Sequence, residues 1–132
     1  MTPSASTQQS NQPTYVEEPA IYEFTTQLSS DEAVTDVAVP IDRDSDFLLT
    51  GIWGSSSGEF TLNFRLPSGR QISNQQILNT DILGTANQPV SIGPPPIYRA
   101  GSVGPQLDLT DISGATNNIT ILFGGIRRIR TT

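Results

Sequence analysis

The chain contains no histidine, no cysteine and no lysine, and all seven of its basic residues are arginine. These three missing residue types supply most enzymatic bases, nucleophiles and transition-metal ligands. Without cysteine the chain forms neither a disulfide nor a thiolate metal site, and a serine nucleophile would lack its usual histidine or lysine base. The composition therefore argues against an enzyme and against a bound cofactor, and it favours a protein that folds and binds.

Long apolar runs are missing as well. No stretch approaches the ~18 apolar residues that a membrane helix needs, so we expect no membrane partner. The N-terminus lacks the basic start and apolar core of a signal peptide. We also expect no nucleic-acid partner, because a net charge of −6 repels phosphates and the only basic cluster is Arg127, Arg128 and Arg130 at the C-terminus.

The charges are unevenly distributed along the chain. Residues 1–46 carry nine acids and one arginine, whereas residues 47–132 carry four acids and six arginines. Either the two parts pair inside one fold, or they contact other copies or a larger partner. Arginine suits such contacts, because its planar guanidinium binds carboxylates with two parallel hydrogen bonds. We therefore take Arg127, Arg128 and Arg130 as candidate partner-binding residues.

The length of 132 residues predicts one folded domain, preceded by an arm over residues 1–20. Up to Thr14 this segment has no large apolar residue beyond Met1, and three prolines punctuate it (Pro3, Pro13 and Pro19). Such a segment buries too little surface to offset its ordering entropy. It is therefore either a disordered tail or an extended arm that orders on a partner, with Tyr15 and Val16 as candidate anchors.

Residues 21–132 are expected to form the folded domain, because the pattern there changes to a period of two. The segment Glu59–Leu66 alternates strictly between apolar and polar residues, which is typical of a half-buried strand. Phe47–Trp53 is nearly all apolar, as in a central strand covered on both faces, so Trp53 is expected in the core. The Ser/Gly-rich segment between the two predicts a hairpin, and residues 113–118 predict a second.

Further strands are predicted at Ile21–Leu28, Val34–Ile41, Val90–Ile92, Ile97–Tyr98, Gln106–Asp111 and Ile119–Arg128. Gly124 and Gly125 interrupt the last strand and indicate a bulge or a close backbone approach. Helical signals are weak and are confined to Asn74–Leu83, with Asn74 as a possible N-cap. About eight short strands with Gly, Pro, Ser and Asn turns predict an all-β, antiparallel β-sandwich, with a jelly-roll as the favoured topology.

Neither a calcium loop nor a sugar-binding face is well supported by the sequence. Asp42, Asp44 and Asp46 have the spacing that starts a calcium loop, but Phe47 replaces the required glycine and Trp53 the bidentate glutamate. A solvated turn is the better interpretation. A sugar-binding face would need exposed rings, and the single tryptophan is expected in the core.

Three segments resemble small virion proteins of tailed bacteriophages. They are FLLTGIWG with the following GEFTLNFRLPSGRQIS, then PVSIGPPPIYRAGSVGPQLDLTDISG, and finally NNITILFGGIRRI, and together they span much of Phe47–Arg130. The head-decoration (cement) proteins that they resemble are β-sandwiches or jelly-rolls with an extended terminal arm. Those proteins sit on the capsid lattice as dimers or trimers.

The resemblance implies a non-enzymatic structural protein of the virion, located on the capsid surface. Its partner would be the major capsid protein, whose joints it would reinforce, and it would be a homo-oligomer, either a dimer or a trimer. A tail, baseplate or fibre-associated virion domain is the first alternative. A carbohydrate-binding module is the second.

Overall fold

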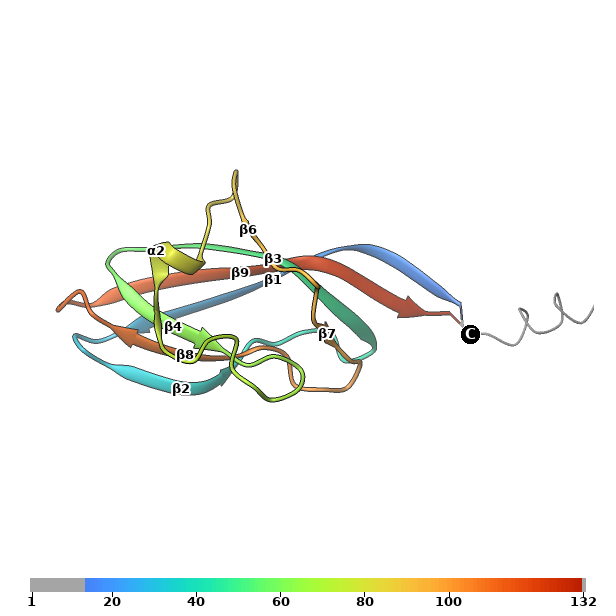
Figure 1. Ribbon diagram of the computed structural model, residues 1–132, viewed down its shortest axis with the longest axis horizontal. Coiled ribbons are helices and arrows are strands. Elements are labelled where there is room, and N and C mark those ends of the chain that lie inside the picture. Colours follow the sequence, from blue (N-terminus) through green and yellow to red (C-terminus); the bar gives the residue numbers. More distant parts are fainter. Residues whose placement is uncertain (1–13, 132) are drawn as a thin grey trace, which may run out of the picture.

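The computed structural model describes residues 14–131, and nearly all of its regular structure is β-strand. Figure 1 labels the strands of two antiparallel sheets, which face each other across one apolar core. The predicted antiparallel β-sandwich is therefore confirmed. Sheet A is formed by β1 (Tyr15–Leu28), β9 (Asn117–Arg130), β3 (Ser45–Ser56), β6 (Val90–Ser91) and β7 (Ile97–Tyr98). Sheet B is formed by β2 (Ala33–Ala38), β8 (Gln106–Asp111), β4 (Phe60–Phe64) and β5 (Ile77–Leu78).

The strand order is that of a jelly-roll. In sheet A, β1, β9 and β3 lie side by side, and β6 and β7 both pair with the far edge of β3. In sheet B the order is β2, β8, β4 and β5. Neighbours in sequence such as β3 and β4, or β8 and β9, thus lie in opposite sheets, so the favoured jelly-roll topology is confirmed. The two predicted hairpins are wrong, because loops 57–59 and 112–116 cross between the sheets.

The core is built from the alternating positions that the sequence predicts. Phe60, Leu62 and Phe64 of β4 are fully buried, as are the inward-facing leucines and isoleucines of β8 and β9. Phe64 of sheet B meets Phe123 of sheet A edge to face, with ring centroids 5.9 Å apart. Burial of these side chains supplies the main driving force for the two sheets to pack together.

Trp53 lies outside this core, so its predicted core position is wrong. Ile52 is fully buried, and Trp53 follows it on the opposite, outer face of β3, where its side chain is partly exposed. A Cβ placed on Gly124 would lie 2.6 Å from Cζ3 of Trp53. The ring therefore lies over Gly124, which leaves it space.

The close approach predicted for the glycine pair is confirmed. A Cβ on Gly125 would overlap the carbonyl oxygen of Leu48 in the neighbouring strand. The register of β3 against β9 also shifts between Leu49 and Gly51, directly opposite the glycines. Glycine is needed here so that the two backbones can approach each other across the bulge.

One helical turn, α2 (Asn79–Ile82), lies within the predicted helical segment 74–83. It begins at Asn79, and the residue before it is Leu78, so the predicted cap at Asn74 is wrong. The side chain of Asn79 instead accepts a hydrogen bond from the backbone N–H of Phe60, at 3.2 Å. Within the described residues, no helix has the length and apolarity to span a membrane.

Strand β1 begins at Tyr15, inside the segment 1–20 that the sequence sets apart as an arm. Residues 15–20 are therefore part of sheet A. Residues 1–13 lie outside the described residues, so the arm stays a prediction for them.

A buried carboxylate ties together the loops at the end of the sandwich where β8 leads into β9. Asp111 is 1% exposed and accepts hydrogen bonds from the Ser113 hydroxyl at 2.6 Å, the Asp31 backbone N–H at 2.9 Å and the Asn117 amide at 3.1 Å. The Ser113 hydroxyl, followed by the Asp31 N–H, holds the pKa of Asp111 well below its usual range. The ionised carboxylate is thus the form that the fold requires.

We predict that Gly125→Ala lowers the free energy of unfolding by about 1–3 kcal/mol, because the added methyl group meets the carbonyl oxygen of Leu48. Chemical denaturation measures the change. Gly93→Ala is the matched control, since its Cβ would have no heavy atom within 4 Å. Equal stability of the two variants would contradict the bulge geometry.

Asp111 also predicts a dependence of stability on acid. Because its pKa is lowered in the folded state, its contribution is complete above the ordinary aspartate pKa of ~3.9 and is lost as the pH falls below it. Asp111→Asn should be less stable than the wild type at neutral pH, and this difference should shrink below about pH 4. Denaturant unfolding over a pH series measures it. A difference that does not change with pH would exclude this role.

Candidate partner-binding surface

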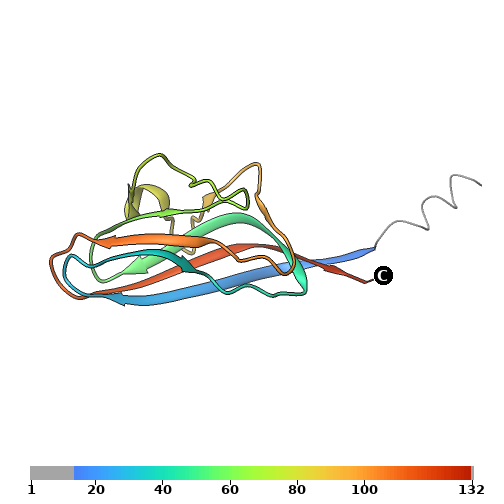
Figure 2. The same cartoon turned by 90° about the horizontal axis from the view of Figure 1, so that it is seen from below.

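The start of β1 and the end of β9 lie side by side at one end of sheet A, as Figures 1 and 2 show, and β3 pairs with the other side of β9 as far as Ile129. We call residues 15–19 and 126–130 the ribbon. Their register places Tyr15 opposite Arg130 and Val16 opposite Ile129. The structure thereby brings together the five residues that the sequence nominates for partner binding: Tyr15, Val16, Arg127, Arg128 and Arg130. They come from opposite ends of the chain, and whether they bind a partner stays a prediction.

Ion pairs hold the two strands of the ribbon to each other. Nε of Arg128 lies 3.0 Å from a carboxylate oxygen of Glu17, its partner in the register. Nη1 of Arg127 lies 2.7 Å from Oε1 of Glu18, again its register partner. Glu17 and Glu18 point to opposite faces of the strand, so the ribbon is paired on both faces.

Arg127 also connects the ribbon to the loop that precedes β3. Its Nε lies 2.7 Å from Oδ2 of Asp42, and the hydroxyl of Tyr22 donates a hydrogen bond to the same oxygen at 3.1 Å. The contacts with Tyr22 and Glu18 raise the pKa of the Arg127 guanidinium. The Tyr22 ring in turn meets Phe47 of the core edge to face at 4.8 Å. The base of the ribbon is therefore anchored to the core.

The tip of the ribbon presents apolar surface. Tyr15 and Val16 are 42% and 49% exposed. The guanidinium carbon of Arg128 lies 5.6 Å from the centre of the Tyr15 ring, at a distance where a cation is attracted to the ring face. This contact helps to hold an exposed aromatic ring in place, which reduces the entropy lost when a partner covers it.

The same pairs account for the uneven charge distribution. Every ion pair found among residues 14–131 joins an arginine of the second part of the chain to an acid of the first 46 residues. The two remaining pairs are Arg65 with Asp36 at 2.9 Å and Arg99 with Asp46 at 3.4 Å. Of the two interpretations left open by the sequence, pairing within one fold is thus observed. Arg127 and Arg128 are already engaged by acids of their own chain.

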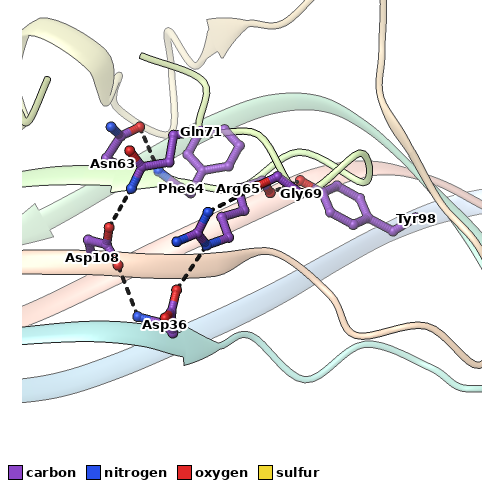
Figure 3. A network of polar contacts seen from close by, with 8 residues as sticks. All are labelled: Asp36, Asn63, Phe64, Arg65, Gly69, Gln71, Tyr98 and Asp108. Atoms are coloured by element: carbon purple, nitrogen blue, oxygen red, sulfur yellow. Dashed lines mark hydrogen bonds and ion pairs between the residues drawn. The ribbon is translucent and has the colours of Figure 1, made fainter. Parts of the chain in front are cut away.

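A second polar cluster, shown in Figure 3, lies on the outer face of sheet B. Asp36 accepts a hydrogen bond from Nε of Arg65 at 2.9 Å and donates its backbone N–H to Asp108, also at 2.9 Å. The other carboxylate oxygen of Asp108 accepts from the Gln71 amide at 2.6 Å. Arg65 donates further to the carbonyl oxygen of Gly69 at 3.0 Å. These bonds fasten the loop after β4 onto the sheet.

No motif in the sequence indicates this cluster. Asp108 alternates with the buried Leu107 and Leu109 and so faces away from the core, but it is only 9% exposed because Gln71 and Asp36 bond to it. Asp36 has a φ of 54°, a left-handed conformation that aspartate tolerates better than most residues. A pattern of alternating residues predicts neither the left-handed conformation of Asp36 nor the packing of the loop after β4 back onto the sheet. With its polar groups bonded to each other, the cluster fits a structural role.

In the described part of the chain, residues 14–131, neither a metal site nor an enclosed cavity stands out. No group of three potential metal-ligating side chains gathers anywhere in residues 14–131, and in the Asp42–Asp46 motif the first and last acids pair with Arg127 and Arg99. An open hollow of about 290 Å³ lies between residues 38–43 and 101–104. Its walls are mostly apolar, with Arg43 as its single charged residue.

Comparison with known proteins adds a distant likeness. No family model matches the chain, and no curated protein matches it. Among solved structures, a similar chain comes from Bacillus endospore appendages, described as a novel family of disulfide-linked pili. The match covers 92% of this chain and 93% of that one, at 14% sequence identity and a TM-score of 0.39. A likeness this weak carries no conclusion about function, and the present chain has no cysteine with which to form such disulfides.

We predict that Arg127→Gln lowers the free energy of unfolding by about 1 kcal/mol, because it removes two partly exposed ion pairs worth roughly 0.2–1 kcal/mol each. The loss should shrink at high salt, which screens these pairs. Arg99→Gln is the control, because its side chain is 68% exposed and its single pair is longer, at 3.4 Å. Denaturation at low and high salt compares them, and an equal effect of both substitutions would contradict the anchoring role of Arg127.

Proposed function

We propose that this chain is a non-enzymatic structural protein of a virion that binds the outer surface of a capsid and reinforces contacts between major capsid proteins. The observation that carries the proposal is the ribbon. It lies at one end of sheet A, its two strands are joined by ion pairs at Glu17–Arg128 and Glu18–Arg127, and it exposes Tyr15 and Val16 close to where residues 1–13 join. A rigid body with such a ribbon at one end is suited to reaching a neighbouring subunit.

In this proposal the jelly-roll is the rigid body, and residues 1–13 continue from the ribbon along the capsid. Each contact is weak, but several copies or several contacts on one lattice add up to strong attachment. Binding to the assembled shell and not to free subunits stabilises the shell by mass action. The charge pairs of the ribbon keep Tyr15 and Val16 in one arrangement before binding, so that less entropy is lost on the capsid.

Two other functions share part of this support. A tail, baseplate or fibre-associated protein of a virion would use the same ribbon, and its position in the particle would distinguish it. A carbohydrate-binding module gains one observation, because Trp53 lies partly exposed on the outer face of sheet A. Binding of a glycan that quenches the fluorescence of this single tryptophan would favour that module.

Deletion of residues 1–13 tests the capsid proposal. The deletion stops before Tyr15, because β1 starts there and a longer deletion would remove sheet pairs. We expect the full chain to co-sediment with phage heads prepared without it, and the truncated chain to co-sediment several-fold less. Its melting temperature should remain nearly unchanged.

A chain with residues 1–13 replaced by an equally long Gly/Ser segment is the matched control, because it keeps the length and removes the side chains. Equal binding by the full and truncated chains would exclude the arm. If the full chain does not bind heads but is found on tails or baseplates, the result would exclude the capsid proposal and support a tail, baseplate or fibre-associated protein.

A further inference from the structure

Only one edge of the two sheets is long and regular within residues 14–131. The edges formed by β5, β6 and β7 are two residues long each. The edge of β2 is interrupted between Val34 and Val37, where Asp36 takes a left-handed conformation and turns its N–H to Asp108. Strand β1, in contrast, is paired to β9 residue by residue from Tyr15 to Leu28, without a bulge. Its other side lies at the end of sheet A.

The backbone groups that point out of this edge follow from the register. The N–H of Thr131 donates to the carbonyl oxygen of Thr14 at 2.8 Å, so Thr14 is bonded towards the β9 side. Because bonding alternates along an antiparallel strand, the odd-numbered residues turn their backbone groups to the free edge. Pro19 belongs to this set, so its missing N–H removes no hydrogen bond to β9. The free edge therefore offers the N–H and carbonyl groups of Tyr15, Glu17, Ile21, Glu23, Thr25 and Gln27, and only the carbonyl oxygen of Pro19, which leaves one N–H···O bond unmade at that position.

An apolar side chain stands near the middle of this edge. Ile21 is 59% exposed and lies opposite Gly124, over which the Trp53 ring is placed. The outer face of sheet A thus carries apolar surface from Trp53 to its free edge. A long, regular edge strand with such a residue is what sheets ordinarily cover or interrupt.

The acids of β1 oppose self-association less than their number suggests. Glu17 and Glu18 are held by Arg128 and Arg127. Among the described residues no ion pair involves Glu23. The position of Glu23 therefore determines which registers of a β1–β1 pair bring like charges together.

We infer that β1 is a self-association edge, at which a second copy of this chain adds its own β1 in antiparallel orientation about a two-fold axis at Ile21. In this register Ile21 faces Ile21 of the second copy, Pro19 faces Glu23, Glu17 faces Thr25 and Tyr15 faces Gln27. No acid faces an acid, and the two exposed isoleucines cover each other. The two A sheets become one continuous sheet, in an interface that uses the same surface of both copies.

Other centres are less favourable. An axis at Ala20 places Glu17 opposite Glu23, and an axis at Glu23 places that acid opposite itself, where like charges destabilise the pair. An axis at Tyr22 places Ile21 opposite Glu23 and loses the apolar contact. Ile21 also lies near the midpoint of Tyr15–Leu28, so its register overlaps almost the whole strand. The inference stands independently of binding to a capsid.

The absence of cysteine permits a direct test, because Ile21→Cys introduces the only thiol of the chain. Directly opposed, hydrogen-bonded residues of antiparallel strands have Cα atoms about 5.5 Å apart, within the range that disulfides bridge. We expect mild oxidation to convert this variant to a covalent dimer on non-reducing gels. Val103→Cys is the control, because Val103 is 60% exposed and Ile21 is 59% exposed. Glu23→Cys tests the register, since its copies would lie four residue positions apart, about 14 Å.

Sedimentation of the full chain provides the second measurement. We expect twice the mass of one chain for the wild type and for Val103→Glu, and a single-chain mass for Ile21→Glu, which places two acids on the two-fold axis. A wild-type monomer, a dimer that Ile21→Glu leaves intact, or oxidation of Ile21→Cys no faster than that of Val103→Cys would each overturn the inference. Circular dichroism establishes that Ile21→Glu is folded, which an exposed position permits.

Discussion

The structure depends on the pairing of its first strand with its last. Strand β9 lies between β1 and β3 and holds both over most of its length. Its inward side chains, Ile119, Ile121 and Phe123, are fully buried and form one wall of the core. Its glycines allow β3 to approach, and its arginines reach the acids of β1. A single strand thus joins the core, the bulge and the ribbon.

Charge in this molecule serves mainly to connect parts of one chain. Acids of the first 46 residues form ion pairs with arginines that are far away in sequence, and these pairs lie at the margins of the sandwich. Arginine is suited to these positions, because it remains charged at every physiological pH and holds carboxylates through a planar group. The buried carboxylate of Asp111 shows the other solution, in which hydroxyl, amide and backbone donors replace a cation. Both arrangements fix loops and strand ends.

The alternating segments predicted the fold well, because alternation reports which side chain faces the core. Phe60, Leu62 and Phe64 were placed correctly for this reason. Alternation does not report which strand pairs with which, so it does not distinguish a hairpin loop from one that crosses between the sheets. A nearly all-apolar strand such as Phe47–Trp53 predicts cover on both faces, whereas the outer face of β3 at Trp53 is partly exposed. The candidate partner-binding residues lie together because of the register of β1 against β9. No local sequence pattern predicts that register.

The pairing of the two ends has a consequence for biosynthesis. Strand β1 is made before the rest of the sandwich, yet its partner β9 is made after all the other described strands. Contacts so distant in sequence slow folding, because a long loop must be closed before they form. Sheet A cannot close until β9 has been made, and until then both edges of β1 are open to other chains. When this protein is produced at high concentration, pairing of β1 with its own β9 therefore competes with pairing of β1 with another chain.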